Sequence, residues 1–135
     1  MSKIELRWHD EEKRILRYTF PAFWEWDDFA DVKRRADALL DESPHPVMLV
    51  MDTRPTQRVP LSTLAMTRHF LLARHAKGRP ILILTENVLI RSLFHTLRRI
   101  TGRVTEDLLL VRDEHEIVTA LEMWQQGQSN QLSDF

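Results

Sequence analysis

Polar and charged side chains follow an apolar run in the middle of the chain, and their types could bind a ligand or a protein partner. The run is Pro46–Met51, and it leads into Asp52, Thr53 and Arg54, with Arg58 further on. A carboxylate can orient a ligand, a hydroxyl adds a polar contact, and arginine binds phosphate or carboxylate groups. An unbroken apolar run of this length is typical of a strand covered on both faces. The crevice beyond such a strand is the usual place for a site in an α/β sheet, so we expect one here.

Asp52 allows two interpretations. It can accept hydrogen bonds from the amides of the following loop, or pair with Arg54, and so fix the turn. Alternatively, it orients a ligand or partner, and Thr53, Thr56 or Ser62 provide further polar contacts. A hydroxyl close to Asp52 is also a candidate phosphorylation target, and the candidates are Thr53 and Thr56.

The arginines of the middle segment are a second candidate site. Residues 54–103 carry 10 Lys and Arg against 1 acid, whereas 1–53 carry 8 against 12 and 104–135 carry 1 against 7. This segregation indicates an anionic partner, or pairing with the protein's own acidic segments. In the first case Arg54 and Arg58 form an anion pocket at the amino end of the next helix. In the second case the arginines are surface residues paired with acids, and the set is Arg54, Arg58, Arg68, Arg74, Arg91, Arg98 and Arg99.

The helix predicted from Ser62 to Lys77, with Gly78 as its stop, has apolar residues on two sides. At about 100° per residue, Arg68 shares one side with several leucines, and Phe70 belongs to a second apolar stripe roughly opposite. Only one stripe can face the sheet, so the other is left at least partly exposed. Large exposed apolar patches mark interfaces. We therefore expect this helix to form part of a homodimer or partner surface.

Other chemistries lack their motifs. The chain has six histidines and no cysteine, and the histidine spacing does not bring three or four metal ligands together. There is no G-x-S-x-G motif, and the three glycines provide no phosphate-cradling loop. We therefore expect no metal, no cofactor and no catalysis. Trp24 and Trp26 fit a hydrophobic staple at the start of a helix, or the lining of a hydrophobic pocket.

The composition is that of one globular domain: 135 residues, of which 43% are hydrophobic and 29% are charged. We expect the domain to span 1–127 and the polar residues 128–135 to form a frayed tail. No apolar run reaches the ~20 residues that cross a bilayer, and the N-terminus lacks the apolar core of a signal peptide. A cytoplasmic location is therefore expected.

Hydrophobic periodicity predicts nine elements in the order β-β-α-β-α-β-α-β-α. The first two strands, 3–8 and 14–20, form a hairpin. Later strands at 81–84 and 108–111 are continuous apolar runs like the one at 47–52. Each later strand is separated from the next by a helix, so these strands must be mostly parallel, and the fold class is α/β. Capping residues and acidic first turns place the helix starts near Trp24, Ser62, Asn87 or Thr85, and Asp113.

This element order, with a Trp-rich entry to the first helix and a central strand that ends in an acid and a hydroxyl, resembles the STAS family. Its best-known members are bacterial anti-sigma-factor antagonists, and the lipid-binding SEC14-like domains share the architecture. In the antagonists, a strand similar to Val47–Asp52 continues Asp-Ser-Ser-Gly-Leu-Gly, and the second serine is the phosphorylated switch. Asp52 and Thr53 match the family's Asp and first hydroxyl, whereas Arg54 stands at the phosphorylated position. The resemblance therefore implies the fold more than the switch.

Three functions are compatible with these features. The first is a non-catalytic regulatory domain that binds a protein partner through the loop at 52–58 and the helix after it. The second is a pocket for a small anion or a lipid, built from Arg54, Arg58 and apolar helix walls. The third is nucleic-acid binding by the basic middle segment. It ranks last because no aromatic residue interleaves the arginines and the flanking segments are acidic.

Overall fold

The computed structural model describes residues 2–102 and 106–132, and it confirms the predicted α/β fold and element order. Within these residues the strands are β1 (Glu5–Trp8), β2 (Ile15–Thr19), β3 (Val47–Asp52), β4 (Gly78–Leu84) and β5 (Leu108–Val111). The helices are α1 (Trp26–Glu42), α2 (Thr63–Leu72), α3 (Val88–Thr101) and α4 (Glu114–Leu132).

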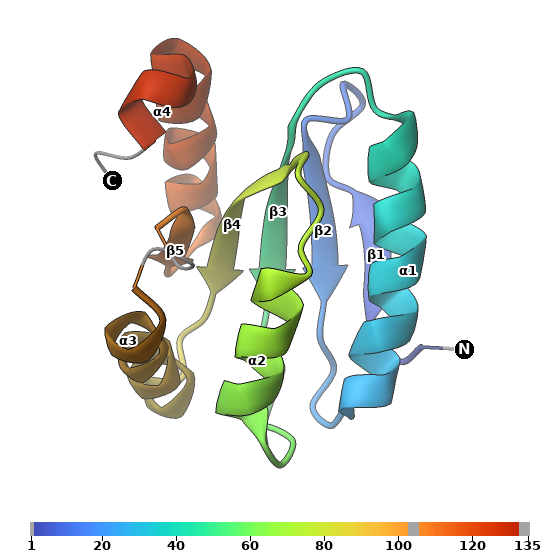
Figure 1. Cartoon of the computed structure of the whole chain (residues 1–135), viewed down its shortest axis with the longest axis vertical. Helices are drawn as coiled ribbons and strands as arrows, with labels where there is room; N and C mark the ends of the chain where they lie inside the picture. The colour runs from blue at the N-terminus through green and yellow to red at the C-terminus, as the bar shows by residue number, and fades with distance from the viewer. Residues whose placement is uncertain (1, 103–105, 133–135) are drawn as a thin grey trace.

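The strands form one mixed sheet in the order β1-β2-β3-β4-β5 (Figure 1). β1 runs antiparallel to β2, as the predicted hairpin requires, and the remaining neighbours are parallel. β3 lies in the centre, and all six of its residues are buried, which confirms the central strand expected from the apolar run. Its carboxyl end places Asp52 beside Thr19 of β2 and Leu84 of β4.

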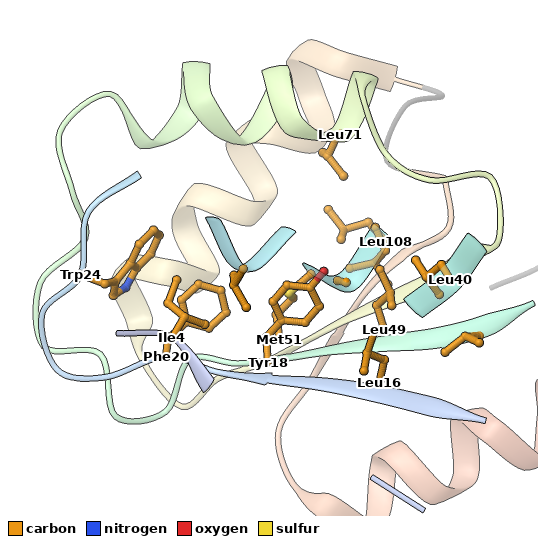
Figure 2. Packing of buried hydrophobic residues seen from close by; sticks show 14 of the residues in the cluster. Ile4, Leu16, Tyr18, Phe20, Trp24, Leu40, Leu49, Met51, Leu71 and Leu108 are labelled. Carbon is orange, nitrogen blue, oxygen red and sulfur yellow. The ribbon is translucent and has the colours of Figure 1, made fainter. Parts of the chain in front are cut away.

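Two apolar cores lie on opposite faces of the sheet. Each parallel connection moves one strand further in the same direction, and right-handed crossovers then bring α1, α2 and α3 to one face. The core on that face includes Ala36 of α1, Leu49 of β3 and Leu71 of α2, and Figure 2 shows Leu71 directed toward the sheet. α4 follows the edge strand β5 and covers the other face, where Ile117 packs with Val50.

α2 is shorter than predicted. It ends at Leu72 rather than Lys77, and Gly78 and Pro80 belong to β4 instead of stopping the helix. Gly78 is buried, and a Cβ atom there would lie 2.9 Å from Cδ1 of Leu49. The glycine therefore allows close packing against the end of the Leu49 side chain, and the intervening residues form the turn into β4.

α1 begins at Trp26, later than the predicted start at Trp24. Glu25 takes the N-cap position, and its amide donates a hydrogen bond to the carboxylate of Asp28 at 2.9 Å. Trp24 precedes the helix and is buried in the core. The local acids thus set the helix start, while the tryptophan is fixed by tertiary packing.

α3 and α4 begin as predicted. The side chain of Asn87 caps α3 by accepting a hydrogen bond of 2.7 Å from a first-turn amide. The carboxylate of Asp113 accepts from the amide of Glu116 at 2.9 Å, as expected for a residue that precedes α4. The predicted tail at 128–135 is helical as far as α4 extends, and 133–135 lie outside the described residues.

Candidate functional site

Four charged side chains meet at the carboxyl end of β3, and we call Arg17, Asp52, Arg54 and Glu114 the charge cluster. They come from β2, the end of β3, the following loop and the first residue of α4. Asp52 accepts hydrogen bonds from Nη2 of Arg17 at 2.7 Å and from Nε and Nη2 of Arg54 at 3.0 and 2.9 Å. Glu114 accepts from Nη1 and Nη2 of Arg17 at 2.7 and 2.8 Å, and from Nη2 of Arg54 at 2.6 Å. The charge cluster thus joins α4 to the sheet.

The groups of the charge cluster stay ionised. Arg17 and Asp52 are only 5% and 4% exposed. Burial by itself would raise the pKa of Asp52, but hydrogen bonds from Arg54 and Arg17 outweigh it and hold this pKa below its ordinary value. The hydrogen bonds between Arg17 and Glu114 lower the pKa of Glu114 and raise the pKa of Arg17. An acid–base catalyst needs a pKa near the working pH, so the charge cluster has the properties of a structural joint.

The turn-fixing interpretation of Asp52 is confirmed, because its carboxylate also accepts from the amide of Arg54 at 3.1 Å. The anion pocket predicted from Arg54 and Arg58 has no support in this arrangement, since the two arginines have different partners. Arg54 binds two carboxylates, whereas the guanidinium of Arg58 lies over the ring of Phe23 at 5.5 Å. Two cations and two carboxylates also leave the charge cluster without net charge to attract an anion.

Sequence reasoning missed Arg17 and Glu114 as members of the charge cluster. A signal for Arg17 is its strand spacing, because it lies two residues after the buried Ile15 and so points to the same face of the sheet. An arginine at such a position is rarely fully buried without a partner. Glu114 carries no comparable signal, since an acid in the first turn of a helix is already explained by the helix dipole.

The threonines predicted as polar contacts or phosphorylation targets are buried and hydrogen-bonded. The hydroxyl of Thr53 donates to the carbonyl oxygen of Leu84 at 3.0 Å, and that of Thr56 donates to the carbonyl oxygen of Pro21 at 3.2 Å. Ser62 is exposed at the N-cap of α2, in the left-handed region with φ of 63°. A kinase would therefore reach the two threonines only after this loop had opened.

The two α2 residues predicted as partner contacts differ in exposure. Arg68 is exposed, whereas Phe70 is half-buried and packs against α1, with its ring centroid 4.8 Å from that of Phe29. Phe70, which belongs to the second apolar stripe of this helix, thus packs toward α1 and is not fully exposed. The large apolar side chains left exposed around α2 are Leu61 and Leu72, at 90% and 57%.

Part of the basic middle segment pairs with acids from the flanking segments. Arg74 is bonded to Asp107, and Nε of Arg79 lies 3.6 Å from the same carboxylate. Arg54 pairs with Asp52 and Glu114, as described above. For these arginines the structure agrees with the pairing interpretation of the charge segregation.

A cavity of about 170 Å³ lies between the sheet and helices α1, α2 and α3. The space is partly open to solvent, and it is much larger than the voids usually left inside protein cores. Figure 2 shows part of the surrounding core, with side chains rising from the sheet toward α2. The aliphatic lining comes from β3, β4, α2 and α3, and includes Leu49, Met51, Ile83, Leu64, Leu71, Ile90 and Leu93.

One wall of this cavity is aromatic. It begins at Tyr18 of β2 and continues through Phe20, Trp24, Trp26, Phe29 and Phe70. The ring centroids of Trp24 and Trp26 are 4.9 Å apart and nearly perpendicular, at 79°, which is a favourable aromatic arrangement. Of the two roles expected for these tryptophans, the lining of a hydrophobic pocket is therefore observed.

Comparison with models of protein families, with curated proteins and with solved structures finds no match for this chain. Within the described residues, no helix is long and apolar enough to cross a bilayer. The same parts of the chain contain no group of three or more His, Asp or Glu side chains that could hold a metal ion. The candidate sites within the described residues are therefore the charge cluster and the cavity.

Proposed function

We propose that the protein binds a small apolar molecule in the cavity between the sheet and helices α1, α2 and α3, without catalysis. The observation that carries this proposal is the cavity itself, at about 170 Å³ with an aliphatic and aromatic lining. An engineered apolar cavity of roughly 150 Å³ stays dry and binds benzene. The space is therefore large enough for a single six-membered ring or a short acyl chain.

The energetics favour occupation by a ligand of modest affinity. An enclosed void destabilises a protein by about 24 cal/mol per Å³, and because this space is partly open to solvent, roughly 4 kcal/mol is the upper limit for its volume. A ligand that fills the space recovers at most about this amount, which corresponds to a dissociation constant near 1 mM. A natural ligand that also makes polar contacts would bind more tightly.

An anion is a poorer occupant than a neutral molecule, because the cations that border the cavity already have partners. Nζ of Lys33 lies 2.7 Å from the carboxylate of Asp37, and Arg74 is bonded to Asp107. An additional buried anion without its own counter-charge would be strongly unfavourable. Of the two ligand classes expected from the sequence, the structure therefore favours the apolar one.

Thermal unfolding with toluene tests the proposal. At about 5 mM toluene and a dissociation constant of about 1 mM, linkage predicts roughly 1 kcal/mol of stabilisation. For a domain of this size that corresponds to an increase in Tm of about 3–4 °C. Toluene should raise Tm in a saturable manner, and an equal concentration of benzoate should not. A Tm that toluene leaves unchanged would contradict the proposal.

Binding of a protein partner is a second candidate, and exposed apolar side chains at one edge of the sheet favour it. Phe23, Leu61, Val88 and Leu89 are 52%, 90%, 75% and 51% exposed. They lie in or just after the connections that follow β2, β3 and β4, and the carboxyl ends of parallel strands meet at one edge. This surface includes the loop predicted for partner binding. With this second candidate function we also propose a regulatory role of the kind found in STAS proteins, and a cytoplasmic location.

A pair of charge substitutions tests the second candidate. Leu61→Asp and Val88→Asp should abolish self-association in sedimentation, or capture of a partner from the protein's own cell extract. Leu72→Asp is the matched control, because Leu72 is also exposed but lies at the opposite end of α2. Unchanged association or capture in the two edge variants would count against this surface.

A further inference from the structure

We infer that the ligand of this cavity is a neutral molecule that carries a hydrogen-bond acceptor, such as a carbonyl or ether oxygen, bound by the hydroxyl of Tyr18. This inference rests on the proposed function, because it specifies the chemistry of a ligand in the same cavity. It depends on polar groups that the surrounding protein leaves without partners.

Tyr18 is the first of these groups. Its side chain is 2% exposed, and none of the hydrogen bonds between described residues involves its hydroxyl. Figure 2 shows the hydroxyl oxygen pointing away from the sheet, toward α2, and Tyr18 lines the cavity. A tyrosine hydroxyl can donate one hydrogen bond, so this one is available to a ligand in the cavity.

Two indole N–H groups on the same aromatic wall are also unpaired. Nε1 of Trp24 and Nε1 of Trp26 are buried, and neither has a hydrogen-bond acceptor within the described residues. Both side chains line the cavity. An indole nitrogen can only donate, and buried indoles usually find a partner. Three unpaired donors beside one apolar space therefore select for an acceptor on the ligand.

Three hydroxyls of the lining are already engaged. The hydroxyls of Thr53, Thr56 and Thr63 donate to backbone carbonyl oxygens. Burial, together with the charge of Asp37, raises the pKa of Tyr18, so its hydroxyl remains a donor at neutral pH. The unpaired groups are uncharged, and an uncharged ligand avoids the penalty of burying an ion without a counter-ion.

Three probes of similar size separate the possibilities: ethylbenzene, acetophenone and benzoate. Their dissociation constants are measured by NMR titration of the full chain. Acetophenone should bind roughly 3- to 10-fold more tightly than ethylbenzene, because a net hydrogen bond of about 1 kcal/mol corresponds to that range. Benzoate should bind more weakly than both.

Tyr18→Phe identifies the donor. This variant keeps the ring and removes only the hydroxyl, so it should bind ethylbenzene as the wild type does and lose most of the advantage of acetophenone. Trp124→Phe is the control, because Trp124 packs on the opposite face of the sheet, and it should leave both affinities unchanged. If Tyr18→Phe did not fold, the order of the three probes on the wild type would still test the inference.

The outcomes distinguish this inference from the proposal beneath it. Equal binding of ethylbenzene and acetophenone would overturn the acceptor inference and leave the apolar cavity site intact. Tightest binding of benzoate would overturn the neutral charge. Binding of none of the three probes would contradict the cavity site itself, and with it both statements.

Discussion

Asp52→Asn removes one charge from the charge cluster and keeps the shape of the side chain. In the wild type this carboxylate is 4% exposed and accepts from Nη2 of Arg17 at 2.7 Å. Asparagine retains one acceptor oxygen but places an amide donor next to a guanidinium donor. Loss of one partner of a buried ion pair typically costs 3–5 kcal/mol. Because Glu114 still binds Arg17, we expect the lower end, about 3 kcal/mol.

Urea unfolding at pH 7 measures this loss, and pH provides an internal check. The folded-state pKa of Asp52 lies below its ordinary value of 3.8. Its ion pairs therefore add stability at pH values above about 4, and this contribution disappears as pH falls through the folded-state pKa. The difference between wild type and Asp52→Asn should accordingly shrink at pH 2–3. Glu114→Gln, at a half-exposed position, should cost about 1 kcal/mol or less. A loss below 1 kcal/mol for Asp52→Asn at pH 7 would refute this account of the charge cluster.

Two further substitutions test the packing on the cavity face. Gly78→Ala should lower stability by about 1–3 kcal/mol in urea unfolding, since its Cβ would press on Leu49; a neutral effect would show that the site relaxes freely. Ile83→Trp should fill the cavity and abolish the Tm increase with toluene while the protein stays folded by circular dichroism, and a preserved increase would place toluene elsewhere.

The fold could be predicted because its main signals are local. The apolar run at Val47–Met51 identifies a strand buried on both faces, and caps such as Asn87 and Asp113 mark helix starts within one turn of their residues. The end of α2 could not be placed in this way. Gly78 looks like a helix stop in sequence, but it lies in β4 and packs tightly against the end of Leu49 in the adjacent strand.

The site was predictable only in part, since its contacts join distant segments. The sequence located Asp52 and Arg54 and offered the turn-fixing interpretation, but Arg17 and Glu114 are 97 positions apart and meet only in the folded chain. The cavity left even less trace. Periodicity shows which side of α2 is apolar, and not whether its side chains fill the space above the sheet. Phe70, expected at a partner surface, is half-buried and lines the cavity.

The most direct test of the central claim is a titration of the ¹⁵N-labelled protein with toluene, followed through the four indole N–H resonances. Trp24 and Trp26 line the cavity, and Trp124 lies on the opposite face of the sheet. If toluene occupies the cavity, the resonances of Trp24 and Trp26 will shift with a common dissociation constant near 1 mM, and that of Trp124 will remain in place. Unmoved resonances of Trp24 and Trp26 at saturating toluene would contradict a ligand site in this cavity.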